Sequence, residues 1–219
     1  MSTKTTDSHS VPVEGPKANR SRLPRGRHGL SRAEVEADQR FRIAMAMSVA
    51  MSEKGYGATT VADILAGAGV SRESFYALFD SKSDCFLKAF EMAAAELLRR
   101  VQAGGAAELD GSPRERLALV VSAYLDQVRD NPAQARLFLV ESWAAGPAAL
   151  QRRIGVQEVL AENLMELLGL HGHEGSFNAS AFVACVGSLV SRELLKGEDA
   201  DLDQLRGPVV DVGCRMLEL

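Results

Sequence analysis

The chain has 219 residues, 46% of them apolar and 25% charged, and its 25 Lys and Arg against 29 Asp and Glu give a net charge of −4. This composition is ordinary for a soluble globular protein, and the length allows one domain or two small ones that fold without disulfides or metal. Three widely spaced cysteines argue against a disulfide framework and a cysteine–zinc site. No apolar stretch approaches the roughly 20 residues of a membrane span, so we expect a cytoplasmic protein without a membrane partner.

The charge is distributed unevenly along the chain. Residues 1–102 hold 15 basic and 12 acidic side chains, a net +3, whereas residues 103–219 hold 10 and 17, a net −7. Within the first half, residues 16–32 contain six basic residues and no acidic one. An acidic protein with one locally basic end is compatible with a polyanion that only this end contacts.

Helical periodicity is the regular pattern in the sequence, so the predicted fold class is all-α, with about nine helices. Residues 1–30, rich in Ser, Thr, Pro and Gly, are predicted to be a disordered basic arm. The first helix begins after Ser31, whose spacing to Glu34 is that of a capping box, and ends with Gly55 as its C-terminal cap residue. Its predicted buried face consists of Ile43, Ala46, Met47 and Ala50.

Two short helices joined by a glycine-containing turn follow the first helix. Thr60 and Asp63 have capping-box spacing, Gly69 marks the break, and Ser71 is placed to cap the third helix. Two short helices joined in this way are a helix-turn-helix. We therefore predict a helix-turn-helix domain over residues 31–80.

Residues 81–219 are predicted to be a linking helix and a C-terminal helical body. The linking helix begins near Ser81 and ends at the glycine-containing loop 103–105, the expected hinge between domains. The later helices are predicted to begin at Ser112-Pro113, to run from Asn131-Pro132 to Gly146-Pro147, and to span about 148–168, about 178–196 and most of 201–218, where Pro208 either kinks the helix or resets its start.

The third helix has two faces of opposite character. Phe75, Leu78 and Phe79 are spaced to anchor it against the first two helices, which leaves Arg72, Glu73, Ser74 and Tyr76 outward. In a DNA major groove Arg can donate to guanine, Glu can accept from cytosine, Ser can do either, and a Tyr hydroxyl can reach a phosphate. The alternative is an ordinary solvated helix face, and the helix alone does not decide between them.

Two basic features support contact with DNA. Lys82 falls in the first turn of the fourth helix, where the helix dipole disfavours a cation and a bound phosphate would resolve the conflict. Arg22, Arg25 and Arg27 lie in the arm around a Pro and a Gly, and such a segment suits a narrow minor groove. The alternatives are a solvated lysine and a solubilising tail.

Several motifs together resemble the DNA-binding domain of TetR-family bacterial transcription regulators over about residues 33–90. They are Gly-Tyr-Gly-Ala-Thr-Thr-Val-Ala-Asp-Ile at 55–64, Ala-Gly-Val-Ser at 68–71, Phe75-Tyr76, Phe79, Lys82 and Cys-Phe-Leu at 85–87. The resemblance implies a three-helix DNA-binding head, a linking helix, a ligand-binding body and a homodimer built mostly from the last two helices. By position it implies phosphate contacts from Thr60, Tyr76 and Lys82 and base reading by Arg72, Glu73 and Ser74.

The resemblance does not extend to the residues of the body, where the candidates are weaker. Tyr124, Phe138 and Trp143 are the candidate pocket residues, although core packing is the stronger interpretation of Trp143. His171 and His173, in the loop expected after the seventh helix, are interpreted as solvated, while Cys85 and Cys185 are expected to be buried. No pattern predicts catalytic residues, a metal site or a cofactor.

Three functions fit these observations. The leading hypothesis is a homodimeric repressor that binds a pseudo-palindromic operator in double-stranded DNA and responds to an apolar or amphipathic small molecule. The alternatives are an architectural DNA-binding protein without an effector and, less favoured, a helical enzyme with a basic tail. Small residues on one side of the eighth helix favour dimerisation through the last two helices: Ala181, Ala184, Gly187, Ser188 and Ser191.

Overall fold

The computed structural model describes residues 31–104 and 110–219, and the predicted basic arm with Arg22, Arg25 and Arg27 lies outside these residues. The described residues form α-helices and short 3₁₀ helices with no strand, which confirms the all-α fold class. The α-helices are α1 (Arg32–Ala58), α2 (Val61–Ala68), α3 (Arg72–Leu78), α4 (Lys82–Ala103), α5 (Pro113–Asp130), α6 (Pro132–Leu139), α7 (Pro147–Leu168), α8 (Gly172–Leu194) and α9 (Arg206–Met216). The 3₁₀ helices are η1 (Glu141–Trp143), η2 (Gly197–Asp199) and η3 (Asp203–Leu205).

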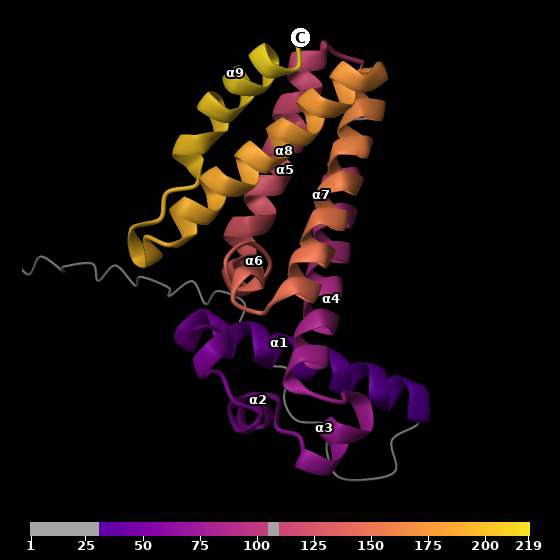
Figure 1. Cartoon of the computed structure of the whole chain (residues 1–219), viewed down its shortest axis with the longest axis vertical. Coiled ribbons are helices and arrows are strands. Elements are labelled where there is room, and N and C mark those ends of the chain that lie inside the picture. Colours follow the sequence, from indigo (N-terminus) through magenta and orange to yellow (C-terminus); the bar gives the residue numbers. More distant parts are fainter. Residues whose placement is uncertain (1–30, 105–109) are drawn as a thin grey trace, which may run out of the picture.

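The molecule has a head and a body stacked end to end (Figure 1). In the head, α1 lies across the molecule and α2 and α3 lie on its far side from the body. α4 rises out of the head beside α7, and α5, α6, α8 and α9 complete the body. The C-terminus lies at the end of the body farthest from the head.

The head helices begin at the residues that their capping signals predict. Ser31 accepts from the Glu34 amide and Thr60 from the Asp63 amide, each in a complete capping box, and Ser71 accepts from the Ser74 amide. These bonds satisfy donors that a helix start otherwise leaves unpaired.

The end of α1 differs from the prediction. Gly55 does leave helical geometry, with φ 76° and ψ 164°, but one further turn follows and the helix ends at Ala58. The Thr59 amide and hydroxyl both donate to the Gly55 carbonyl, at 3.1 and 2.8 Å, and these bonds close the extra turn. Gly55 is therefore a kink within α1.

Two boundaries in the body also differ from the prediction. α6 ends at Leu139 instead of near Gly146, because the Leu139 carbonyl accepts from the buried Arg153 guanidinium and from the Ser191 hydroxyl. η1 follows. α8 begins at Gly172, earlier than predicted, and so places His173 on the helix.

The last helix resolves the alternatives left open for Pro208. α9 begins at Arg206, so Pro208 lies in its first turn, where the amide hydrogen that proline lacks would have no helical partner. The proline accompanies the start of the helix and does not kink it.

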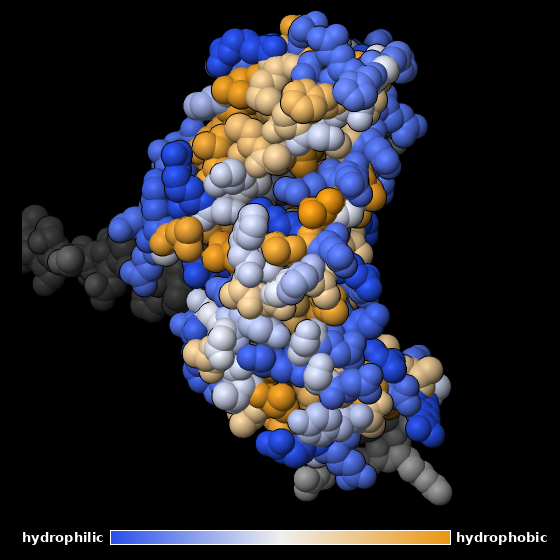
Figure 2. Space-filling model, in the orientation of Figure 1, coloured by the Kyte–Doolittle hydropathy of each residue, from blue (hydrophilic) through white to orange (hydrophobic). Residues whose placement is uncertain are grey.

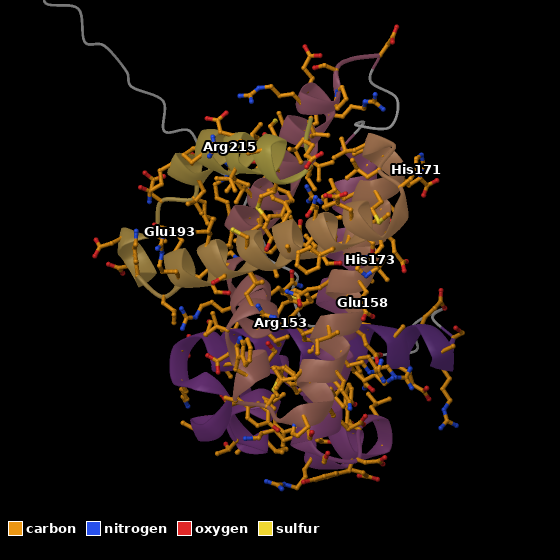
Figure 3. The ribbon with its side chains drawn as sticks, turned by 45° about the horizontal axis from the view of Figure 1, so that its top comes forward. Arg153, Glu158, His171, His173, Glu193 and Arg215 are labelled. Atoms are coloured by element: carbon orange, nitrogen blue, oxygen red, sulfur yellow. The ribbon has the colours of Figure 1, made fainter. Side chains whose placement is uncertain are left out.

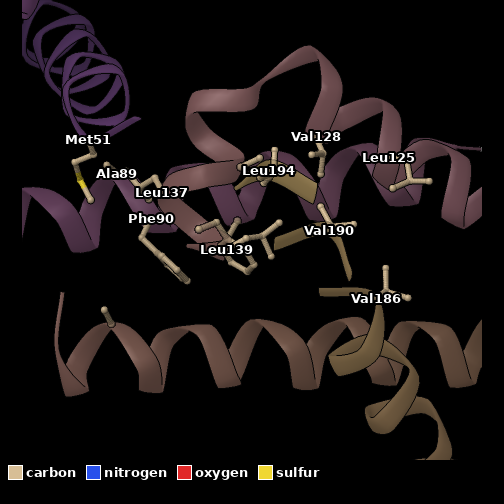
Figure 4. Packing of buried hydrophobic residues seen from close by; sticks show 14 of the residues in the cluster. Met51, Ala89, Phe90, Leu125, Val128, Leu137, Leu139, Val186, Val190 and Leu194 are labelled. Carbon is tan, nitrogen blue, oxygen red and sulfur yellow. The ribbon is translucent and has the colours of Figure 1, made fainter. Parts of the chain in front are cut away.

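A single apolar core runs from the head into the body. Met51 of α1, Phe90 of α4 and Leu137 of α6 are all almost completely buried and belong to one cluster. Figure 4 shows these three side chains close together at the junction of head and body. Burying a side chain of this size contributes about 1.5–3 kcal/mol, so the shared core holds the head at a defined orientation to the body.

Candidate nucleic-acid interface and ligand pocket

The structure confirms the two-faced third helix. Phe75 is fully buried and Leu78 half-buried, whereas Arg72, Glu73 and Tyr76 are exposed, Tyr76 to 49%. Phe79, the remaining anchor, is buried as the residue that ends α3. The exposed face therefore lies at the end of the molecule opposite the body (Figure 1).

Ser74 is less available than its neighbours on α3. It is half-buried, and its hydroxyl lies 2.9 Å from that of Ser71, the helix cap. A base contact would have to share a hydroxyl that already bonds within the helix start. The exposed groups on this face are therefore the Arg72 guanidinium, the Glu73 carboxylate and the half-exposed Tyr76 side chain, whose ring makes an edge contact with Phe75.

The Thr60 hydroxyl is occupied as well. It donates to the Asp63 carboxylate at 2.7 Å and accepts from the Asp63 amide at 3.2 Å. Lys54 donates to the same carboxylate at 2.6 Å, and this bond, followed by those from Thr60, lowers the pKa of Asp63. Asp63 is therefore ionised, and its carboxylate would lie beside any phosphate that Thr60 contacts. The ammonium of Lys54 lies next to that carboxylate.

Lys82 has partners within the chain. Its ammonium donates to the carbonyls of Tyr56 and Thr59, at 2.8 and 2.9 Å, and lies 4.2 Å from the centre of the Tyr56 ring. The predicted conflict with the dipole of α4 is therefore compensated by carbonyls at the end of α1, where a cation is favoured. Lys82 therefore joins the first turn of α4 to the C-terminal end of α1.

The body contains a cavity of about 430 Å³ between α4, α5, α6, α7 and α8. Tyr124 and Phe138, two of the three candidate pocket residues, line it. Burial raises the pKa of the Tyr124 phenol, which keeps it neutral. Other walls come from apolar side chains such as Val120, Leu160 and Val186. A cavity of this size and character fits a small organic molecule.

The structure contradicts both interpretations of Trp143, as a core residue and as a pocket residue. It is 65% exposed, so the expected core packing is wrong, and it does not belong to the cavity wall. Because α6 ends early, η1 directs Trp143 outward, with the Arg153 guanidinium carbon 5.3 Å from its ring centre. Burial lowers the pKa of Arg153, which Figure 3 places in the middle of the molecule.

The cavity also holds polar side chains that were not among the sequence candidates. Arg116 Nε and Asn163 Nδ2 are buried without a hydrogen-bond partner, and both residues line the cavity. Their spacing carries a signal: Arg116, Val120 and Tyr124 follow at four-residue intervals on one face of α5. Asn163 likewise interrupts an apolar stripe on α7. A polar residue inside a helical apolar stripe marks a pocket or a buried network.

A direct contact joins the body to the kink in α1. The buried carboxylate of Glu141 accepts from the Tyr56 amide at 2.8 Å. The carbonyl of the same Tyr56 accepts from Lys82 of α4. Since Glu141 follows closely after Leu139, which lines the cavity, a short stretch of chain connects the cavity wall to the head.

The remaining candidates lie apart from these sites. His171 and His173 are exposed, and Figure 3 places both at the outer side of the body. Cys85 is buried as expected, whereas Cys185 is only half-buried. Within residues 31–104 and 110–219, no group of three or more His, Cys, Asp and Glu is placed to hold a metal ion, and no helix is long and apolar enough to cross a membrane.

Comparison with known proteins identifies the head and the fold. Residues 47–89, from α1 to α4, match the family model of bacterial regulatory proteins of the tetR family. A fatty acid degradation regulator, FadR from Bacillus halodurans, has a similar structure, with 19% identity, a TM-score of 0.68, and 80% of this chain and 94% of that chain covered. So does FadR from Bacillus subtilis, solved in complex with stearoyl-CoA, at 18% identity, TM-score 0.65, and coverage of 79% and 96%.

A tetR-family regulatory protein from Rhodococcus RHA1 is also similar, with 23% identity, a TM-score of 0.63, and coverage of 82% of this chain and 96% of that chain. At these identities the likeness concerns the fold. The chain matches none of the curated proteins.

Proposed function

We propose that the chain is a homodimeric repressor of the TetR family, whose affinity for an operator changes when a small amphipathic molecule binds the body. The family match of residues 47–89 and the similar fold of FadR support this proposal. The exposed face of α3 carries the proposal. Arg72, Glu73 and Tyr76 project from a short helix that is anchored from behind by Phe75, at the end of the molecule away from the body. This is the arrangement of a recognition helix in a major groove.

In the proposed complex, Arg72, Glu73 and Ser74 read bases, and Thr60, Tyr76 and Lys82 contact phosphates. The hydroxyls of Ser74 and Thr60 already bond within the head, so we assign most of the base discrimination to Arg72 and Glu73. The basic arm with Arg22, Arg25 and Arg27 is proposed to add affinity in the adjacent minor groove. Residues 31–80 would thus form the DNA-binding domain, and 81–219 the regulatory body.

Dimerisation is proposed through α8 and α9. Figure 2 shows apolar side chains gathered on the upper part of the body, where these helices lie. Phe177 of α8 is 67% exposed, and Ala184 and Ser188 are exposed two and three turns further along the same face of the helix. The predicted stripe of small residues is narrower than expected, because Gly187 is buried at the cavity and Ser191 bonds the Leu139 carbonyl. A two-fold dimer would present two α3 helices to a pseudo-palindromic operator.

An effector is proposed to occupy the body cavity and to act on the head through η1. A molecule pressing on Leu139 would shift Glu141, which holds the Tyr56 amide at the kink of α1. The stearoyl-CoA complex of Bacillus subtilis FadR supports a ligand with an apolar chain. A cavity of about 430 Å³ also favours an effector-responsive regulator over an architectural DNA-binding protein.

Genome-wide binding followed by mobility-shift titration tests the proposal. The Arg72→Ala variant should lose roughly 1–3 kcal/mol of discrimination between operator and random DNA, because it removes a base contact. Arg40→Ala, which removes an exposed arginine from α1, is the matched control and should retain discrimination. Equal discrimination by the Arg72 variant and the unmodified protein, or the absence of any preferred site, would overturn the assignment.

A further inference from the structure

We propose that the molecule bound in the body cavity carries a carboxylate, held by Arg116 and Asn163, at the end of an apolar chain that extends toward Phe138. The role of this molecule as an effector rests on the proposed function, whereas its chemistry rests on the cavity itself.

Two unpaired donors mark one part of the cavity. Arg116 Nε and Asn163 Nδ2 are buried and have no hydrogen-bond partner. Buried donors in folded proteins are nearly always paired, and an unpaired one destabilises the fold. Both residues belong to the cavity wall, so a ligand with acceptor atoms would supply the missing partners.

Both donors lie at the same stretch of α7. Arg116, on α5, donates through Nη1 to the Leu167 carbonyl at 3.0 Å, which fixes its guanidinium against α7. Asn163 precedes Leu167 by one helical turn and therefore lies on the same face of α7. An acceptor group between α5 and α7 would meet both donors.

The two ends of the cavity differ in their exposure to solvent. Glu166 lines the cavity next to Leu167, whose carbonyl accepts from Arg116, and its side chain is exposed, so this end opens toward solvent. At the other end the wall includes the buried residues Phe138, Leu139 and Gly187, and the Gln157 amide and Arg153 guanidinium lie beside Gly187. A polar group near the opening and an apolar chain directed inward would match both ends.

A carboxylate fits the donors better than other head groups. It is acceptor-only and charged, and a guanidinium binds it with the strongest hydrogen bonds available to side chains. An alkylammonium would place a cation against Arg116 and leave both donors unpaired. The Glu166 carboxylate is the opposing charge on the same wall, and its side chain is exposed where water screens it.

Calorimetric titration of the full-length protein at pH 8 with dodecanoate, 1-dodecanol and dodecyltrimethylammonium tests the head group at constant chain length. Dodecanoate should bind roughly 10- to 100-fold more tightly than dodecanol, and the ammonium compound more weakly still. Dodecanoyl-CoA forms a fourth arm, because its thioester offers a neutral carbonyl acceptor. It should bind more weakly than the free acid.

Asn163→Leu removes one donor without removing a hydrogen bond of the structure, so it should fold and should reduce the preference for dodecanoate over dodecanol about tenfold. Arg116→Gln should reduce it at least as much. Glu166→Gln is the matched control on the same wall and should leave the preference unchanged or increase it.

The proposal is overturned if no carboxylate binds, if dodecanol binds as tightly as dodecanoate, or if the preference persists in Asn163→Leu. Tighter binding of the CoA thioester would overturn the choice of a free carboxylate. Operator binding by the ligand-free protein is measured in parallel. Its failure would contradict the proposed regulator while leaving the head-group preference intact, so the two failures are distinguishable.

Discussion

The Lys82 ammonium donates to the carbonyls of Tyr56 and Thr59 at the end of α1, although by sequence it is a candidate phosphate ligand. Replacing it by Met should therefore weaken the fold as well as DNA binding. We expect the free energy of unfolding without DNA to fall by about 1–3 kcal/mol, because hydrogen bonds to a charged donor are lost. Urea denaturation measures this effect. Arg72→Ala, which removes an exposed side chain, should unfold like the unmodified protein; equal stability of both variants would mean that Lys82 serves DNA alone.

Cys85 provides a pH-dependent prediction. Burial, with a smaller effect from Asp84, raises the pKa of its thiol from 9.0 to about 12. A thiol whose pKa is higher in the folded state stabilises the fold fully below pH 9, and this contribution is lost as the pH rises toward 12. At pH 8 the folded protein should therefore leave Cys85 unmodified by Ellman's reagent, and urea should expose it. Mass spectrometry identifies the modified residue, and rapid labelling of native Cys85 would contradict its burial.

At the scale of the element, α1 depends on glycine at its kink. Gly55 has φ 76° and ψ 164°, a conformation that side chains disfavour, and a methyl group there would lie 3.6 Å from the Glu141 carboxylate. Gly55→Ala should destabilise the protein by about 1–3 kcal/mol. Gly57→Ala is the control, because its φ is not positive and a methyl group there meets no atom within 4 Å. The control should be neutral or stabilising by about 0.4–1 kcal/mol in thermal unfolding, and equal losses in both variants would exclude strain at the kink.

Elements defined by local signals could be predicted from the sequence, whereas elements ended by distant partners could not. Ser31 and Thr60 cap their helices with atoms three residues away, so spacing alone identifies them. The end of α6 depends on Arg153 and Ser191, which approach Leu139 only in the folded chain. That early end also turns Trp143 outward, against the prediction from its apolar neighbours.

The candidate sites also differ in whether local spacing or the packing of distant helices defines them. The outward face of α3 follows from helical spacing within a few residues, and the structure confirms it for Arg72 and Tyr76. Spacing places Arg116 and Asn163 within apolar stripes of α5 and α7, but only the packing of these two helices shows that both residues line one cavity. Lys82 combines both situations. Its place in the first turn of α4 could be predicted from the sequence, whereas its carbonyl partners at the end of α1 could not.

At the scale of the whole molecule, Glu141 is the polar contact between the body and the kink of α1. Its carboxylate accepts from the Tyr56 amide, and its neighbour Leu139 lines the cavity. If effector binding reaches the head through this bond, Glu141→Leu should reduce the ratio of operator affinities with and without effector toward one. Allosteric ratios are typically about 5- to 150-fold, so the loss is measurable by mobility shift.

Glu141→Gln is the matched control, because its amide oxygen can still accept from the Tyr56 amide. It should retain most of the affinity ratio, while Glu141→Leu also leaves the Tyr56 amide unpaired and should cost about 1–3 kcal/mol of stability. Ligand binding to the cavity should persist in both variants, since Glu141 does not line it. A folded Glu141→Leu protein that binds ligand and still shows the full affinity ratio would show that the coupling between cavity and head bypasses Glu141 and runs through α4 or α6, which both pack against α1.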